Sequence, residues 1–188
     1  MMPIPASTVV VVRQGHKDIE VLLLLRSSVL AFNGGYWVFP GGRIDPEDYP
    51  DSQCQQEYQA ARRAAVRETM EEAGLDINGE PLLHIAHWTT PEGMSRRFST
   101  WFFLCVIPAP QPVRVDAQEI LAHHWLSPRE AIALHQSGEC KLPEPTLQTL
   151  RGFIAFQDLS ALIEGMAPLP IHVFPKDSPF YRVETIED

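Results

Sequence analysis

The chain has 188 residues, of which 45% are hydrophobic and 21% are charged, and this globular composition excludes an intrinsically disordered chain. Its formal net charge of −9 offers no basic surface for duplex DNA or RNA, which excludes nucleic-acid binding as the main role. We expect a single domain over residues 1–188, with a core from about 8 to 174 and a mobile acidic tail over 175–188.

The cysteines and the amino terminus bear on the cellular compartment. Cys54, Cys105 and Cys140 are odd in number and widely spaced, which is more typical of a reducing cytoplasm than of a disulfide framework or a zinc site. The first residues carry no positive charge, and the aliphatic runs are too short to cross a bilayer. We therefore expect a cytoplasmic protein with no membrane contact, and the sequence leaves the oligomeric state open.

The amino-terminal third predicts strands that lead into a glycine corner. Two aliphatic runs, 8–13 and 19–26, predict buried strands joined by a hairpin turn, and a third extended segment is expected over 36–39. Gly41 and Gly42 follow this segment. Because glycine permits tight turns and close backbone approach, carbonyl groups here could face a metal and amide groups a phosphate.

A long helix is expected over 57–73, and its last turns carry three carboxylates. Glu68, Glu71 and Glu72 stand at i, i+3 and i+4, so all three share one helical face. Such a face is either an acidic, solvated helix end or a site where a divalent cation relieves the repulsion. Hard cations such as Mg²⁺ prefer oxygen ligands and commonly bridge to phosphates, so the second reading indicates a phosphate-processing centre.

Beyond this helix, the chain predicts more sheet and then helices. Aromatic and β-branched runs predict core strands over 82–89 and 98–107. Apolar residues at helical spacing follow in the last third of the chain. Helices are expected over 128–136, 144–156 and 158–166, with a final edge strand over 169–174.

Three charged residues beside predicted strands have both a structural and a functional interpretation. Arg26 ends the second strand and Arg97 precedes the strand over 98–107. A lone arginine at a strand end is commonly a surface charge, but a guanidinium there could also bind a substrate phosphate. Glu119 precedes another extended segment, and it is either a surface charge or a catalytic carboxylate.

The glycine corner and the acidic helix together resemble the Nudix hydrolases, whose signature is G-x5-E-x7-R-E-U-x-E-E-x-G-U, with U a bulky apolar residue. Residues 67–75, R-E-T-M-E-E-A-G-L, match the second half, apart from Thr69 at the first U. The first half departs from the signature, because Gln53 and Gln59 stand where glycine and glutamate are expected.

The departure is explained if Gly42 supplies the signature glycine and residues 45–56 are an inserted loop rich in proline and aspartate. The signature glutamate is then missing from its expected place. Whether Glu57 replaces it stays open.

The resemblance implies an α/β fold, namely the Nudix-type α/β/α sandwich with a mixed sheet, here with extra C-terminal helices. Within the superfamily, the chain is similar to the branch that includes the acyl-coenzyme A diphosphatases. The implied function is metal-dependent hydrolysis of a diphosphate linkage in a small nucleoside diphosphate derivative, with coenzyme A or an acyl-coenzyme A as the leading candidate. The alternative is a non-catalytic Nudix domain that senses a nucleotide ligand.

The resemblance also implies roles for particular residues. The expected cofactor is Mg²⁺ or Mn²⁺, held by Glu68, Glu72, Glu71 and the Gly42 carbonyl. The expected catalytic residues are Arg67, Glu71 and Glu119. The expected substrate-binding residues are Arg26, Arg43 and Arg97.

Overall fold

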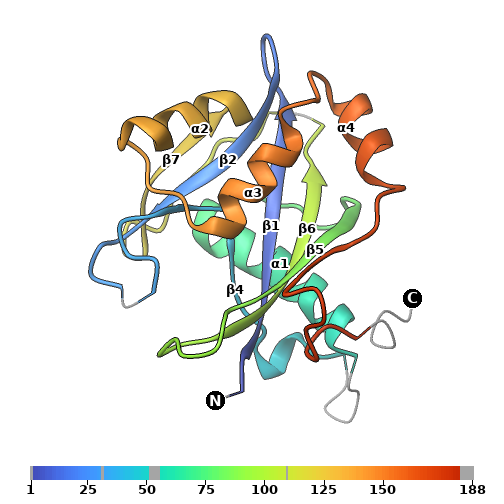
Figure 1. Ribbon diagram of the computed structural model, residues 1–188. Helices are drawn as coiled ribbons and strands as arrows, with labels where there is room; N and C mark the ends of the chain where they lie inside the picture. Colours follow the sequence, from blue (N-terminus) through green and yellow to red (C-terminus); the bar gives the residue numbers. More distant parts are fainter. Residues whose placement is uncertain (1, 31, 51–55, 109, 183–188) are drawn as a thin grey trace.

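The computed structural model describes residues 2–30, 32–50, 56–108 and 110–182, and it is built around one mixed sheet with helices on both faces (Figure 1). Its strands are β1 (Ile4–Gln14), β2 (Ile19–Arg26), β3 (Trp37–Val38), β4 (Gly41–Arg43), β5 (Leu82–Thr89), β6 (Phe98–Val106), β7 (Ile120–Leu126) and β8 (His172–Phe174). Its helices are the short 3₁₀ helix η1 (Pro46–Asp48), α1 (Glu57–Ala73), α2 (Pro128–Ser137), α3 (Glu144–Phe153) and α4 (Leu159–Met166). The α/β class and the mixed sheet predicted from the sequence are confirmed.

Strand β1 is the centre of the sheet. The strand order is β3-β2-β1-β6-β5-β8, while β4 pairs with β1 and β7 pairs with β2. β1 runs parallel to β6 and antiparallel to β2 and β4. Val9 and Val11 face the helix α1, whereas Val10 and Val12 face α2, α3 and α4. Because both faces are covered, the strand reads as an unbroken apolar run.

Helix α1 has the bounds that the sequence predicts. Four alanines on its inner face are fully buried, so the helix packs closely on the sheet; they are Ala60, Ala61, Ala64 and Ala65. The helix ends at Gly74, which adopts the left-handed conformation that favours glycine (φ 63°) and donates its amide to the Met70 carbonyl. This close packing holds α1, and with it Glu68 and Glu72, at a short distance from the sheet.

The predicted mobile tail is wrong for residues 175–182, which pack on the α1 side of the sheet. Ser178 is buried and lies 2.8 Å from Thr89, hydroxyl to hydroxyl. The Tyr181 ring contacts His84 and Trp101, with ring centroids 5.9 and 5.8 Å apart. Residues 175–182 hold one acid and two bases, so this part of the predicted acidic tail carries little charge that would keep its aromatic residues from packing. Residues 183–188 lie outside the described residues.

The inserted loop also holds more structure than expected. Its described part contains η1, and the Asp48 side chain at the end of that turn is buried. Residues 51–55, including Cys54, lie outside the described residues. Cys105 and Cys140 are buried free thiols. In the described ranges, no helix is long and apolar enough to cross a bilayer.

Candidate metal-binding and hydrolytic site

Glu72 is the most deeply buried of the three glutamates on the acidic face of α1, with only 7% of its side-chain surface exposed. The Gly41 amide donates to Glu72 Oε2 at 2.9 Å, and the Arg26 Nη1 donates to Oε1 at 3.3 Å. The carboxylate therefore joins the last turns of α1 to β4 and to the end of β2.

Glu68 lies one turn earlier on α1 and faces the second glycine of the corner. A Cβ atom at Gly42 would overlap the Glu68 carboxylate, so only glycine leaves room for it. Pairing of β4 with β1, with Gly42 opposite Ser7, fixes this corner in the sheet. The structure thus brings Glu68, Glu72 and Gly42 together, as the sequence predicts.

The electrostatics of this pair fit a cation. The pKa of Glu72 is raised to about 8, chiefly by burial and also by the neighbouring Glu68, while the Gly41 amide and Arg26 oppose the shift. Burial also raises the pKa of Glu68, against the opposing effect of Arg67. Arg26 and Arg67 therefore do not fully offset the cost of burying these two carboxylates, and oxygen donors of this kind suit Mg²⁺ or Mn²⁺.

Glu71 does not lie with this buried pair. Its side chain is 58% exposed, and its Oε2 accepts a hydrogen bond from Arg67 Nη1 at 3.3 Å. The expectation that three carboxylates form one compact set is therefore corrected to a buried pair with a third acid at the rim. Within the described ranges, no group of three His, Cys, Asp or Glu side chains is already gathered at metal-binding spacing.

Arg67 is the centre of a network around Glu68. Its Nη1 donates to Glu68 Oε1 at 2.8 Å, and its Nη2 donates to the Arg43 carbonyl at 3.0 Å. Asp48 accepts two further hydrogen bonds, from Nε at 3.1 Å and from Nη2 at 2.8 Å, and Asp45 Oδ2 lies 3.6 Å from Nη2. Asp48 was not predicted from the sequence, although it stands six residues after Gly42, where the G-x5-E half of the signature places its acid. The pKa of Arg67 is raised, above all by Asp48.

Arg26 links the buried pair to Glu119. Its Nη2 lies 3.8 Å from Glu119 Oε2, and the Glu119 side chain is 58% exposed. The Ser27 amide donates to the Glu119 carbonyl at 2.7 Å, which holds this segment against the end of β2. Asp116, another residue that the sequence analysis missed, accepts amide hydrogen bonds from the turn that carries Glu119, including that of Ile120 at 2.8 Å. The bond that Asp116 Oδ1 accepts from the Gln118 amide, two residues on, at 3.1 Å is that of an Asx turn.

The other predicted residues are placed differently. The Arg43 side chain is exposed beside the site, and only its carbonyl is engaged with Arg67. Arg97 does not join the cluster; it is buried, and its Nε donates to the Thr90 carbonyl at 3.0 Å across the β5–β6 turn. Glu57 accepts a hydrogen bond from the Trp101 indole at 2.8 Å, whereas Asp48 contacts Arg67.

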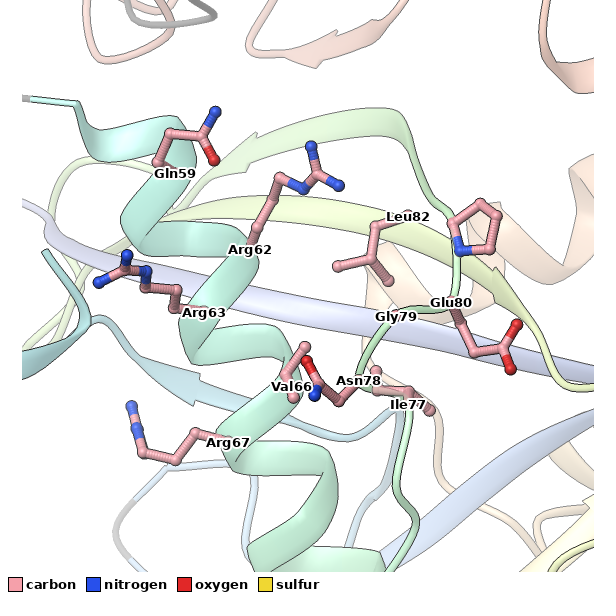
Figure 2. A pocket seen from close by; sticks show the side chains of 11 residues that line it. Gln59, Arg62, Arg63, Val66, Arg67, Ile77, Asn78, Gly79, Glu80 and Leu82 are labelled. Atoms are coloured by element: carbon pink, nitrogen blue, oxygen red, sulfur yellow. The ribbon is translucent and has the colours of Figure 1, made fainter. Parts of the chain in front are cut away.

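A hollow of about 580 Å³ lies along α1, between the helix and residues 77–82 (Figure 2). In Figure 2 the Arg62 side chain leans toward Leu82, whereas Arg63 and Arg67 point to the opposite side of the helix. The hollow adjoins the acidic turn without containing Glu68 or Glu72, so the carboxylate chemistry lies beside it and not inside it.

Comparison with known proteins identifies the family. The family model described as the NUDIX domain matches residues 2–144, and the chain therefore belongs to the Nudix family. A crystal structure of a NUDIX hydrolase from Alicyclobacillus acidocaldarius superposes with a TM-score of 0.79 at 26% identity, covering 90% of this chain and 99% of that one.

Two curated relatives are acyl-coenzyme A diphosphatases. The chain is 42% identical to the Homo sapiens enzyme NUDT19 over 77 residues, which are 40% of this chain and 20% of that protein. It is 24% identical to the Xenopus laevis enzyme over 236 residues, with 77% of this chain and 62% of that protein covered. The chain thus spans less than two thirds of the length of these relatives. The predicted resemblance to the Nudix hydrolases and to this branch is confirmed.

Proposed function

We propose that this chain is a metal-dependent hydrolase that opens the diphosphate linkage of a nucleoside diphosphate derivative. The observation that supports this best is the pairing of the buried Glu72 with the partly buried Glu68 beside the corner formed by Gly41 and Gly42. A pair of buried carboxylates with raised pKa values is costly in a purely structural role, whereas it suits a cation that also contacts phosphate.

In this proposal Mg²⁺ or Mn²⁺ is held by Glu68 and Glu72, with Glu71 and the Gly42 carbonyl as further ligands. When bound, the ion neutralises charge on the phosphoryl oxygens and lowers the pKa of a bound water. Because Gly42 has no Cβ, its backbone approaches the Glu68 carboxylate closely, so its carbonyl could reach an ion held there.

The side chains around the ion position the reactants. Arg67 orients Glu68 through the 2.8 Å hydrogen bond, and Arg26 orients Glu72. Water attacks one phosphorus atom while the P–O bond to the bridging oxygen breaks, and a carboxylate accepts the proton of the water. Glu71 and Glu119 are the candidates for this base, since both are half-exposed at the rim.

Substrate phosphates are assigned to arginines at the rim. Arg26 contacts Glu72, and the exposed Arg43 belongs to the β4 strand whose backbone contacts Arg67; guanidinium groups suit phosphate oxygens. Arg97 is left out, because its guanidinium is engaged at the β5–β6 turn. Coenzyme A or an acyl-coenzyme A is the leading substrate class, on the strength of the relatives alone.

Purified protein incubated with a panel of diphosphate compounds tests the proposal. Coenzyme A, an acyl-coenzyme A, a nucleotide sugar and a dinucleoside polyphosphate are each incubated with Mg²⁺, with Mn²⁺, and with a chelator, and the products are identified by mass spectrometry. We expect cleavage at the diphosphate only when metal is present, and recovery when metal is restored after chelation. Ligand binding without turnover of any compound would instead identify a sensor domain.

The predicted cytoplasmic location remains part of this proposal. It is supported by the buried free thiols of Cys105 and Cys140, which suit a reducing compartment. A small phosphorylated molecule is the proposed partner, and fractionation of cells that express the tagged chain tests the location.

A further inference from the structure

We propose that Asp48, which lies in the inserted loop, is the positioning residue for Arg67 and thereby takes the place of the helix glutamate missing from the family signature. The inference rests on the proposed function of the same site. It assigns a role to a loop that the sequence analysis treated as an insertion only.

The contact between the two side chains has the geometry of a forked pair. Arg67 Nε lies 3.1 Å from Asp48 Oδ1, and Nη2 lies 2.8 Å from Oδ2. Two parallel charge-assisted hydrogen bonds fix the plane of the guanidinium as well as its position, which a single bond cannot do. An arginine held in this way presents its remaining N–H groups in one direction.

Asp48 is itself held firmly enough to act as an anchor. Its side chain is only 5% exposed, and the Asp45 amide donates to Oδ2 at 2.8 Å within the same 3₁₀ turn. The turn contacts α1, so the loop is docked on the helix where Arg67 emerges. A buried, hydrogen-bonded carboxylate loses little further entropy when it binds a cation.

The consequence falls on Glu68. Asp48 fixes the side of the guanidinium that carries Nε. The Arg67 Nη1 then donates to Glu68 Oε1 at 2.8 Å, and Nη2 donates to the Arg43 carbonyl at 3.0 Å. Arg67 alone is a long, flexible side chain that is 28% exposed. Without Asp48, the guanidinium would be free to rotate toward the exposed Glu71, 3.3 Å away, and Glu68 would lose its orientation.

Three other residues could have filled this role. Asp45 carries the charge, but its Oδ2 lies 3.6 Å from Arg67 Nη2 and its side chain is 43% exposed. Gln59 stands at the signature position of the glutamate when counted back from Arg67, but an amide carries no charge for Arg67. In Figure 2 it lies two turns away from Arg67 along α1. Glu57 carries the charge, but its carboxylate accepts a hydrogen bond from Trp101 at 2.8 Å. Among the described residues, Asp48 is the buried acid that meets Arg67.

The experiment compares Asp48→Asn, Asp48→Glu and the matched control Glu47→Gln, which neutralises an exposed neighbour in the same turn. Steady-state kinetics on the substrate identified above and Mn²⁺ titration followed by electron paramagnetic resonance give independent readouts. Both are normalised to the folded fraction measured by circular dichroism at low temperature, so a loss of stability does not decide the result.

We expect Asp48→Asn to lower kcat and to weaken Mn²⁺ binding, each about tenfold or more, with KM changed by less than about twofold. Asp48→Glu should recover most of both, and Glu47→Gln should match the unchanged protein. In an Arg67→Gln background, Asp48→Asn should have no further effect, because Asp48 acts through the arginine.

The inference is overturned if folded Asp48→Asn matches the unchanged protein in kcat and Mn²⁺ affinity, or if its effect simply adds to that of Arg67→Gln. Absence of turnover in the unchanged protein would be a failure of the proposed function instead. In that case the Mn²⁺ titrations of the same variants still decide the role of Asp48.

Discussion

The Gly41 amide and the Glu72 carboxylate meet across 2.9 Å, and this contact joins the glycine corner to the acidic turn of α1. A hydrogen bond to a charged group contributes roughly 1.5–3 kcal/mol, and this one partly offsets the cost of burying Glu72. The donor is a backbone group, so its position follows from the pairing of β4 with β1. The sheet therefore places the acid that the proposed chemistry needs most.

Replacement of Glu72 by glutamine should separate function from stability. Glutamine keeps an oxygen that accepts the Gly41 amide but removes the charge, and burial already raises the pKa of Glu72 to about 8. We expect turnover to fall by about two orders of magnitude. The melting temperature of the metal-free protein should change little, because the loss of the Arg26 contact opposes the lower cost of burying a neutral amide.

Kinetics and thermal unfolding of Glu72→Gln check this, with Glu164→Gln on the exposed side of α4 as the control. Near-normal turnover of the Glu72 variant would remove Glu72 from the proposed metal site. A large drop in melting temperature would make it a structural residue.

A methyl group at Gly42 should disturb the site more than the fold. The Cβ of Gly42→Ala would overlap the Glu68 carboxylate, so the acid must move. A displacement of about 1 Å at a reacting centre can cost on the order of 100-fold in rate, and we expect a loss of about 10- to 100-fold in kcat/KM. The same substitution should weaken Mn²⁺ binding.

Gly152→Ala is the matched control. Gly152 lies in α3 with open space around it, so alanine there should raise stability by about 0.5–1 kcal/mol and leave turnover unchanged. Equal activity of the Gly42→Ala variant and the unchanged protein would show that the close approach of Gly42 to Glu68 has no functional role.

The sequence predicts α1 well because its signals are local. Buried alanines recur at helical spacing, and Gly74 ends the helix in the left-handed conformation. The acidic face follows from the same periodicity, so Glu68 and Glu72 could be placed together without a structure. Their closeness to Gly42 required the family resemblance as well, since a glycine pair alone predicts only a turn.

Contacts between distant segments could not be predicted in this way. Asp48 and Arg67 are 19 residues apart, and the turn that aims the aspartate lies in a segment without periodicity. For Arg97, the sequence suggested a substrate contact that the structure does not favour. Its place before a strand gave no information on which way the guanidinium points, and the structure directs it to the Thr90 carbonyl.

Arg97→Ala should therefore destabilise the protein and leave substrate binding unchanged. Loss of a buried, charge-assisted hydrogen bond to the Thr90 carbonyl should lower the free energy of unfolding by roughly 1.5–3 kcal/mol. Urea unfolding and KM measurements check this, with Arg96→Ala as the control because its side chain is exposed next to Arg97. A raised KM with unchanged stability would restore the substrate-binding role predicted from the sequence.

Two buried histidines should make the fold sensitive to acid. Burial lowers the pKa of His84 to about 4. The pKa of His87 is lowered to about 3, mainly by burial and to a smaller extent by the nearby His84. Both values lie below the ordinary value of 6.5, so between pH 6.5 and about 4 the unfolded chain binds more protons than the folded one. Stability from these residues is therefore fully present above pH 6.5 and is lost as the pH falls, on the order of 1–2 kcal/mol for each at pH 5.

The buried glutamates act in the opposite direction, because their raised pKa values favour the folded state in acid. A comparison of variants isolates the histidine contribution. The His87→Gln variant cannot take up the proton, so its free energy of unfolding should fall less between pH 7 and pH 5. Ser99→Ala removes the hydroxyl 2.8 Å from His87 Nε2 but leaves the imidazole in place, so it should lower stability while keeping the steep pH dependence. Urea unfolding at several pH values measures both, and equal slopes for His87→Gln and the unchanged protein would mean that His87 does not contribute.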